Sequence, residues 1–191
     1  DEDPVFTHKQ FELFDSIVES IPGRDEKFHV HLSNSAGLLD YHSRTTNLVR
    51  PGLLIYGISP LPAHQEFLRP VMTFKSRVSV INHLPKGHGV SYGRTILERD
   101  TKAAILGLGY GDGYPRSLSG KGTSVVLNNS LCPLLGRVTM DQIIVDVTEL
   151  DECHPGDEAE LFGSNLLVSD LAKKAGTIPW EILTQITPRV T

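Results

Sequence analysis

The sequence predicts an α+β fold in which a short series of βα units is followed by a mostly β domain. Two observations support this prediction. Up to about residue 65, helical and apolar strand-like segments alternate, as is typical of a parallel sheet or barrel. Beyond Ser59-Pro60-Leu61-Pro62, short strand-like segments are separated by turns. We therefore expect two domains, residues 1–65 and 66–191, the first of them too short to close a barrel by itself.

The first domain is expected to begin with a helix from Thr7 to Glu19. Apolar residues recur there at steps of three and four, Thr7 and Gln10 form a capping-box pattern, and Pro22-Gly23 ends the helix. The next expected elements are a strand at 28–32, a helix at 36–41, and a second apolar strand made up of 48–49 and then 53–56.

The second domain is expected to consist of short strands and one late helix. Apolar and polar residues alternate over 72–80, as in a strand with one solvated face. Ser169 can cap the helix and Gly176 can end it. The further expected strands are 90–95, 103–109, 124–127, 143–147 and 158–162, with turns at 112–113, 128–129 and 155–157.

The composition excludes several classes of function. Eighteen Lys and Arg against 23 Asp and Glu give a net charge of −5 without long runs, which argues against nucleic-acid or anionic-membrane binding and favours a small-molecule partner. Two cysteines without a CxxC spacing predict no disulfide framework, so a reducing compartment, the cytoplasm, is expected. The acidic start at residues 1–4 is unlike a signal peptide and no apolar run approaches ~18 residues, so we expect neither export nor a membrane span.

The stretch 103–116, AAILGLGYGDGYPR, is the most informative part of the sequence. A strand that looks buried leads into Tyr110, which has glycines on both sides. Glycines let the backbone approach a ligand closely and leave the phenol free of neighbouring side chains. A phenol can transfer protons, but with an ordinary pKa of ~10 it needs nearby positive charge or hydrogen bonds to act as a base at neutral pH. The alternative is a glycine-rich hairpin in which Tyr110 only packs.

Two segments of the first domain offer groups that could bind an anion. In HLSNSA, residues 31–36, a strand leads into a helix whose first turn presents N–H groups and the Ser35 hydroxyl, which suits a phosphate. In VRPGL, residues 49–53, the Arg50 guanidinium precedes a proline and a glycine whose N–H could face an anion. Ser35 could instead cap the helix, and Arg50 could form a structural ion pair.

A third segment, GRVTMDQ at residues 136–142, joins two expected strands. It places the Asp141 carboxylate and a free main-chain N–H in one short turn, although by itself it could be a plain polar connection. The eight histidines show no metal-ligand spacing, and no G-x-S-x-G serine or nucleophilic-cysteine pattern occurs. We therefore expect no metal site.

Seven segments, in this order, resemble the alanine racemase family: HLSNSAG, VRPGLLIYG, VSYGRT, GLGYGDGYPR, GRVTMDQIIVDVT, PGDEAELFG and GTIPWEILTQITPRV. The resemblance covers nearly the whole chain from about Asp3, and GYGDGYPR with RVTMDQ is highly specific. It implies that residues 1–65 are the last units of a (β/α)8 barrel that binds pyridoxal 5′-phosphate, and that residues 66–191 are the family's C-terminal β-barrel domain. It also implies a homodimer whose active sites are shared between subunits.

The resemblance further implies roles for individual residues. Tyr110 would be the base that takes the α-proton from L-alanine, on a cofactor held by the other subunit, with a lysine as the second base. Arg50 would hydrogen-bond the pyridine nitrogen and keep it unprotonated, because arginine does not give up its proton. His31 would support Arg50, the Met140 N–H would contact the substrate carboxylate, and Asp141 would organise the turn.

Two departures from the family pattern affect the cofactor. Ser35, Gly52 and Leu53 match the phosphate-binding group, but this group usually includes a tyrosine where the chain has Trp180, whose indole N–H could substitute. The lysine that binds the cofactor covalently, the histidine behind the catalytic tyrosine and the arginine that grips the substrate belong to earlier barrel strands. None of the eight lysines here matches that motif, so we expect the 191 residues alone not to racemise alanine.

The implied function is a pyridoxal-phosphate-dependent isomerase that interconverts L- and D-alanine and supplies D-alanine for peptidoglycan. Two alternatives remain: a non-catalytic assembly module of a larger or fused protein, and a racemase for serine or a broader set of amino acids. Trp180 favours the module, whereas Tyr110, Arg50, Ser35 and Met140 favour the enzyme, because an interface needs none of their chemistry. In isolation, residues 1–65 are expected to self-associate or be disordered, since uncovered strand edges and apolar faces invite association.

Overall fold

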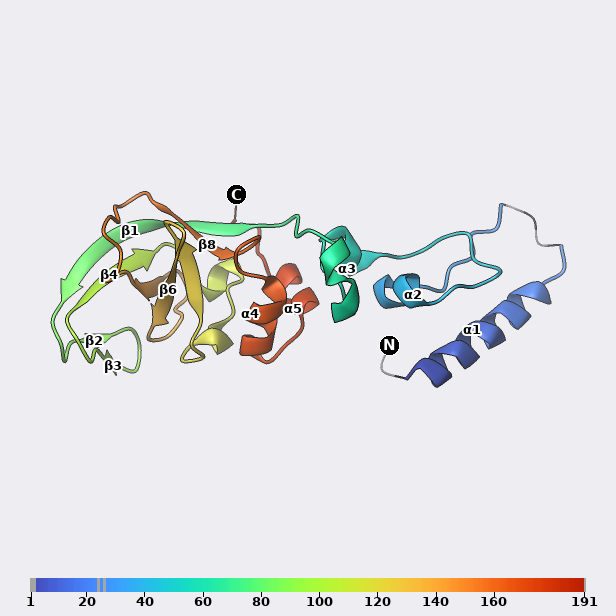
Figure 1. Cartoon of the computed structure of the whole chain (residues 1–191), viewed down its shortest axis with the longest axis horizontal. Coiled ribbons are helices and arrows are strands. Elements are labelled where there is room, and N and C mark those ends of the chain that lie inside the picture. Colours follow the sequence, from blue (N-terminus) through green and yellow to red (C-terminus); the bar gives the residue numbers. More distant parts are fainter. Residues whose placement is uncertain (1–2, 24, 26, 191) are drawn as a thin grey trace. The chain divides into compact units, whose positions relative to one another are not determined.

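The computed structural model describes residues 3–23, 25 and 27–190, and the chain forms two compact units. Unit 1 is Asp1–Val71 and unit 2 is Met72–Thr191. Figure 1 shows the helices of unit 1 in blue to green and the strands of unit 2 from green to orange. Within the described ranges, no helix is long and apolar enough to cross a membrane.

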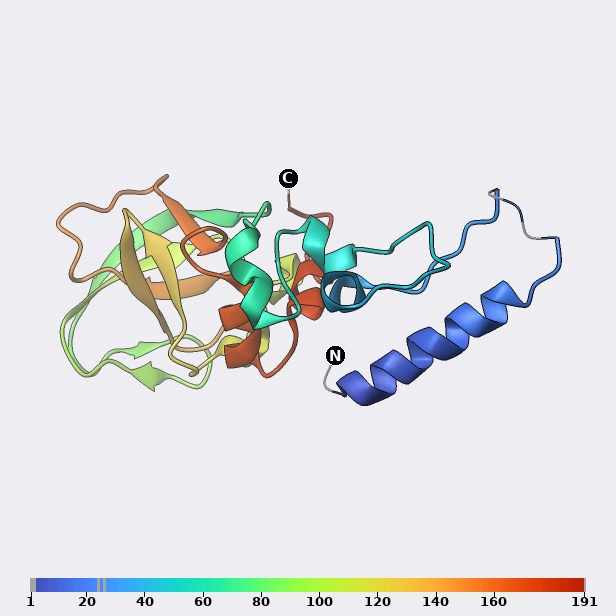
Figure 2. The ribbon, with the colours of Figure 1, turned by 45° about the vertical axis from the view of Figure 1, so that its right-hand side comes forward.

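Unit 1 begins with helix α1 (Pro4–Glu19), the long blue helix of Figure 2. The Asp3 carboxylate accepts a hydrogen bond from the Phe6 N–H at 2.9 Å, and Pro4 occupies the first helical position. The expected start at Thr7 is therefore wrong by about one turn, because an aspartate cap followed by proline is the stronger start signal. The expected end at Glu19 is confirmed.

Two short helices follow, α2 (Ser35–Asp40) and α3 (Gly52–Ile55). The first confirms the expected small-residue helix, whereas the strand expected at 53–56 is wrong. A short apolar run does not distinguish a strand from a buried helical turn. Here Leu53 is buried inside that turn. A 3-10 helix, η1 (Pro62–Phe67), completes unit 1.

The segments before α2 and α3 run parallel to each other. The strand expected at 28–32 forms only one parallel bridge, His31 to Leu48. The Arg50 N–H continues the pairing, since it donates to the Ser33 carbonyl at 3.0 Å. Unit 1 therefore keeps the parallel arrangement with a helical connection that defines a βα unit, although the strands are very short.

A buried carboxylate fastens α1 to the loop after α2. Asp15 accepts hydrogen bonds from the hydroxyls of Ser43 at 2.5 Å and Thr45 at 2.6 Å, and from the Arg44 N–H at 3.1 Å. Burial alone would raise the pKa of Asp15, but these hydrogen bonds stabilise the charged form and lower its pKa to about 2.

Unit 2 is a closed antiparallel barrel of six strands in the order β1-β4-β7-β6-β5-β8 (Figures 1 and 2). The strands are β1 (Phe74–Leu84), β4 (Thr101–Leu106), β5 (Ser124–Leu127), β6 (Ser130–Leu135), β7 (Ile143–Asp146) and β8 (Glu158–Phe162). A separate hairpin consists of β2 (Gly89–Val90) and β3 (Thr95–Ile96). The expected β-barrel domain is confirmed.

Strand β1 curves around the barrel and pairs with two partners, β4 and β8. Its pairing register shifts between Val78 and Val80, and again between Phe74 and Lys75. Bulges of this kind bend a strand, which a closed barrel of six short strands requires.

Strands β5 and β8 have the expected bounds, but β6 was not expected. β6 contains Pro133, which nevertheless lies opposite Ser124 of β5. The turn expected at Asn128-Asn129 is confirmed, with φ of 49° and 61°. Positive φ at both central residues is the geometry of a two-residue hairpin turn.

The barrel core is formed by the inward-facing side chains of the strands. β5 and β7 alternate between buried and partly exposed residues, as strands with one buried face do, whereas four consecutive residues of β8 are buried. The fully buried side chains on the strands include Leu106, Val125, Leu127, Ile143, Val145 and Leu161.

Two helices end unit 2, α4 (Val168–Ala175) and α5 (Pro179–Thr184). Gly176 ends α4 in the left-handed conformation, with φ of 76°, as expected. Ser169 lies inside the helix rather than at its cap, and α5 was not expected.

Candidate active site

Tyr110 lies in a turn that directly follows strand β4. The turn is a short 3-10 helix, η2 (Tyr110–Asp112), which pairs with the segment that holds Met140. The Tyr110 N–H donates to the Thr139 carbonyl at 3.0 Å, and the Gly111 N–H donates to the Met140 carbonyl at 2.9 Å. The two segments that the sequence singled out, 103–116 and 136–142, are therefore joined by main-chain hydrogen bonds.

The glycines beside Tyr110 allow this close pairing. A Cβ atom on Gly109 would lie 2.1 Å from the Thr139 carbonyl oxygen. On Gly113, whose φ is 104°, it would lie 2.4 Å from the Gln185 carbonyl oxygen. The glycines thus let backbone approach backbone, with no ligand needed to account for them.

Tyr110 and Met140 both present part of their side chains to solvent, at 42% and 51% exposure. Among the residues that the structure describes, the main-chain N–H groups of Met140 and Asp141 have no acceptor. The site therefore combines an accessible phenol with adjacent free N–H donors, which can hold a carboxylate.

Three charged side chains lie at the base of these two turns. The Asp112 carboxylate accepts a hydrogen bond from the Gly109 N–H at 2.9 Å. Arg189 contacts Asp112, with 3.3 Å between Nε and Oδ1, and Asp141, with 2.6 Å between Nη2 and Oδ1. Neither Arg189 nor Asp112 is predicted to have a role from the sequence, because a contact between residues 77 positions apart leaves no local signal. The only available signal was that the resembling segments contain all three residues.

The predicted phosphate-binding residues of unit 1 form one contact group. The Ser35 hydroxyl accepts hydrogen bonds from the N–H groups of Leu53 at 3.0 Å and Leu54 at 3.4 Å. Ser35 does not cap α2, because Asn34 does so by accepting from the Gly37 N–H at 3.0 Å. A Cβ on Gly52 would meet no atom within 4 Å, so the space in front of its backbone is open.

Arg50 is held by His31 and by the backbone. Its guanidinium donates to Nδ1 of His31 and, at 3.3 Å, to the Leu32 carbonyl. Since arginine has no acceptor, this contact requires that Nδ1 of His31 carries no proton. Within the described part of the chain Arg50 forms no ion pair, so the contacts give no support to the structural alternative.

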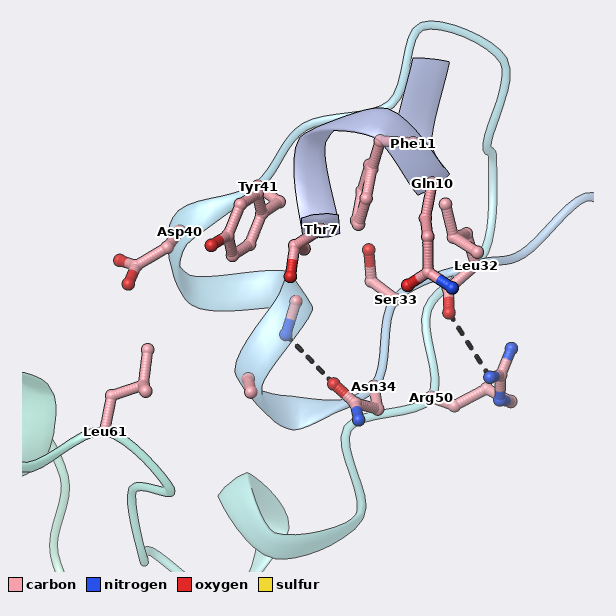
Figure 3. A pocket seen from close by; sticks show the side chains of 12 residues that line it. Thr7, Gln10, Phe11, Leu32, Ser33, Asn34, Asp40, Tyr41, Arg50 and Leu61 are labelled. Atoms are coloured by element: carbon pink, nitrogen blue, oxygen red, sulfur yellow. Dashed lines mark hydrogen bonds between the residues drawn. The ribbon is translucent and has the colours of Figure 1, made fainter. Parts of the chain in front are cut away.

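A pocket of about 220 Å³ lies beside Arg50 in unit 1 (Figure 3). Thr7, Gln10 and Phe11 of α1 form one wall, and Asn34 with Arg50 lies on another. Of the residues predicted to bind the cofactor, only Arg50 lines this pocket, so its shape alone identifies no ligand.

Trp180, also predicted to contact the cofactor, is the second residue of α5 and is partly exposed. Among the described residues, the contacts that join Tyr110, Met140 and Asp141 do not extend to it. In the same residues, no group of three His, Cys, Asp or Glu side chains is placed to hold a metal ion.

Both units match domains of one class of isomerase. Residues 71–191 match the model of the alanine racemase C-terminal domain, and residues 1–60 match that of the alanine racemase N-terminal domain. The chain therefore belongs to the alanine racemase family.

Individual alanine racemases are also similar to this chain in sequence and structure. Alanine racemase of Vibrio vulnificus is 42% identical over 188 residues, which are 96% of this chain and 51% of that protein. The crystal structure of alanine racemase from Streptomyces lavendulae is 36% identical, with a TM-score of 0.86 over 96% of this chain and 50% of that one. The Bartonella henselae alanine racemase with covalently bound pyridoxal phosphate is 31% identical, with a TM-score of 0.87 over 100% of this chain and 52% of that one. The chain spans about half the length of these relatives.

Proposed function

We propose that these 191 residues are the C-terminal part of a pyridoxal-phosphate-dependent alanine racemase. It would act in the cytoplasm as a homodimer, interconvert L- and D-alanine with two bases, and supply D-alanine for peptidoglycan. The observation that supports this most is the pairing of the Tyr110 turn with residues 139–140, at 3.0 and 2.9 Å. Family membership supports the choice of reaction.

The residues of unit 1 fit a phosphate-bearing cofactor. The Ser35 hydroxyl oxygen accepts from the N–H groups of Leu53 and Leu54, and among the described residues this hydroxyl donates to no partner, so its own hydrogen can be donated to a phosphate. The Gly52 N–H donates to the Arg50 carbonyl at 3.0 Å, and the space in front of the Gly52 backbone is open. We assign the phosphate to Ser35, Gly52 and Leu53, with Trp180 as a further donor. When bound, pyridoxal phosphate supplies an electron sink that makes the α-proton of an amino acid acidic.

Arg50 would face the pyridine nitrogen of this cofactor. It fits that role because it is always charged and donates hydrogen bonds without accepting any. The contacts with His31 and the Leu32 carbonyl hold its guanidinium in one orientation. His31 would therefore act through Arg50 and not on the substrate.

In unit 2, Tyr110 would move a proton and Met140 would orient the substrate. The phenol oxygen of Tyr110 would take the α-proton of L-alanine and, in the reverse direction, would give a proton to the same face to form L-alanine. The free N–H of Met140 would donate to the substrate carboxylate, with Asp141 ordering the turn behind it. As family resemblance implies, this site would serve the cofactor of the other subunit.

The test is racemisation by the full-length protein that contains this chain, with pyridoxal phosphate added. We expect conversion of L-alanine to D-alanine, slower conversion of serine, and no activity from the 191 residues alone, because no lysine of the expected motif is present. Faster conversion of serine than of alanine would mean that serine, and not alanine, is the preferred substrate. No racemisation of either amino acid would overturn the enzyme assignment in favour of an assembly module.

A further inference from the structure

Arg189 joins the two turns that hold the proposed catalytic groups. Its guanidinium contacts Asp112, two residues after Tyr110, and Asp141, the residue after Met140. The three side chains come from three separate parts of unit 2. One cation therefore bridges the phenol-bearing turn and the turn with the free N–H groups.

The backbone around Arg189 strengthens this bridge. The Thr187 N–H donates to the Asp112 carbonyl at 3.3 Å, and its hydroxyl donates to the Gly111 carbonyl at 3.1 Å. Residues 187–189 therefore lie along the Tyr110 turn and fix where the guanidinium can reach.

Gly111 lies between Arg189 and Met140. A Cβ atom added there would be 2.5 Å from Nη1 of Arg189 and 3.0 Å from the Met140 carbonyl oxygen. The guanidinium thus packs against the residue next to Tyr110 without a gap.

The charges favour the bridged state. The hydrogen bond with Asp141 and the attraction of Asp112 raise the pKa of Arg189 above its ordinary value. Without the arginine, the buried Asp112 would lose its ion pair and keep only its bond to the Gly109 N–H. Asp112 would then be free to turn away, and the register between the two turns would loosen.

We propose that Arg189 is a positioning residue that sets the Tyr110 phenol relative to the Met140 N–H by bridging Asp112 and Asp141. This inference rests on the proposed function for its catalytic consequence, but the bridge itself can be tested without activity. Arg189 acts through the two carboxylates and does not touch the substrate.

A second arginine on the same barrel provides a matched control. Arg99 bridges Asp146 at 3.1 Å and Glu149 at 2.6 Å, with side-chain exposures of 55%, 13% and 79%. The corresponding exposures for Arg189, Asp112 and Asp141 are 52%, 13% and 58%. The two arginines therefore resemble each other in charge, exposure and partners, but only Arg189 lies at the Tyr110 turn.

The first test uses amide hydrogen exchange of the 191-residue chain, measured by NMR, in Arg189→Gln, Arg189→Lys and Arg99→Gln. We expect Arg189→Gln to speed exchange at Gly109 and Gly111 by about ten-fold or more, because local opening of the turn becomes easier. Arg189→Lys should retain part of the protection, and Arg99→Gln should leave it unchanged. Unchanged exchange in Arg189→Gln, or equal acceleration in Arg99→Gln, would overturn the bridge.

The second test uses the full-length protein with pyridoxal phosphate and measures α-deuterium incorporation from heavy water. We expect Arg189→Gln to slow exchange of L-alanine about ten- to a hundred-fold, the order of loss that an ångström of misplacement causes. Exchange of D-alanine, which uses the other base, should fall much less, and Arg99→Gln should change neither. Equal losses with both enantiomers would show a merely structural role and overturn the proposal.

The two tests separate this inference from the proposed function. If the unmutated full-length protein racemises nothing, the proposed function fails, while the exchange contrast between Arg189→Gln and Arg99→Gln still decides whether the bridge exists.

Discussion

Unit 1 and unit 2 both contain many apolar residues, but unit 2 buries more of them than unit 1 does. Unit 2 closes its main sheet into a barrel, so each of the six barrel strands has two neighbours and the inward side chains are buried. In the described part of unit 1, α1 and α3 leave large apolar residues exposed, among them Phe6, Ile17 and Ile55. An antiparallel barrel can complete itself within about a hundred residues, whereas βα units depend on neighbours for both their strand edges and their helix faces.

The largest expected effect is a difference in stability between the two units within this chain. Amide protection should be at least about a hundred-fold lower in α1 and α2 than in β4 and β5, because opening free energies follow buried apolar contact. Hydrogen exchange measures this, and sedimentation should show concentration-dependent association through the exposed faces of unit 1. Equal protection in a monomer would show that unit 1 is stable without further neighbours.

An intermediate effect is expected from Asp15, the buried carboxylate of unit 1. Asp15→Asn should destabilise unit 1 by about 1–3 kcal/mol at neutral pH, because it weakens hydrogen bonds to a buried charge. The pKa of Asp15 is lowered from 3.8 to about 2 on folding, so its contribution is present above about pH 4 and is lost as the pH falls toward 2.

Circular dichroism at a series of pH values checks this prediction. Glu12→Gln, a change of an exposed carboxylate on the same helix, is the control. An Asp15→Asn variant as stable as the control at pH 7, or one with the same acid dependence as the unmutated chain, would contradict it.

The smallest effect is expected from Tyr114 in unit 2. Its side chain is fully buried, burial raises its pKa, and its hydroxyl has no partner among the described residues. Tyr114→Phe should therefore cost no stability and could add up to about 1 kcal/mol. Thermal unfolding followed by the fluorescence of Trp180, the only tryptophan, measures it. A decrease of more than about 1 kcal/mol in the free energy of unfolding would mean that the Tyr114 hydroxyl forms a hydrogen bond.

The difference between local sequence patterns and contacts made only on folding explains which parts of the fold could be predicted. β5 and β8 can be predicted from short strand-like segments bounded by turn residues, since each signal is complete within a few residues. The 53–56 segment was assigned to a strand because four apolar residues fit either a strand or a helical turn. The sequence pattern predicts no strand at β6, and its Pro133, which has no N–H to donate, is nevertheless paired with Ser124 of β5.

The candidate site shows the same division. The glycines around Tyr110 mark that residue locally, whereas Met140 is identified only by the resemblance to the family, which also gives both residues their roles. Arg189 could not be identified, because its contacts with Asp112 and Asp141 exist only in the folded barrel. The sequence suggests that the glycines beside Tyr110 make room for a ligand, but in the structure Gly109 makes room for the Thr139 backbone and Gly113 for the Gln185 backbone.

The central claim is that Tyr110 is the base that removes the α-proton of L-alanine. The most direct measurement is α-deuterium incorporation into L- and D-alanine in heavy water, with the full-length protein, pyridoxal phosphate and the variants Tyr110→Phe and Tyr114→Phe. We predict that Tyr110→Phe slows exchange of L-alanine by about 10²–10⁴-fold, the usual contribution of a positioned acid or base. D-alanine should still exchange, and Tyr114→Phe should behave like the unmutated protein. Unchanged exchange of L-alanine in Tyr110→Phe would contradict the account.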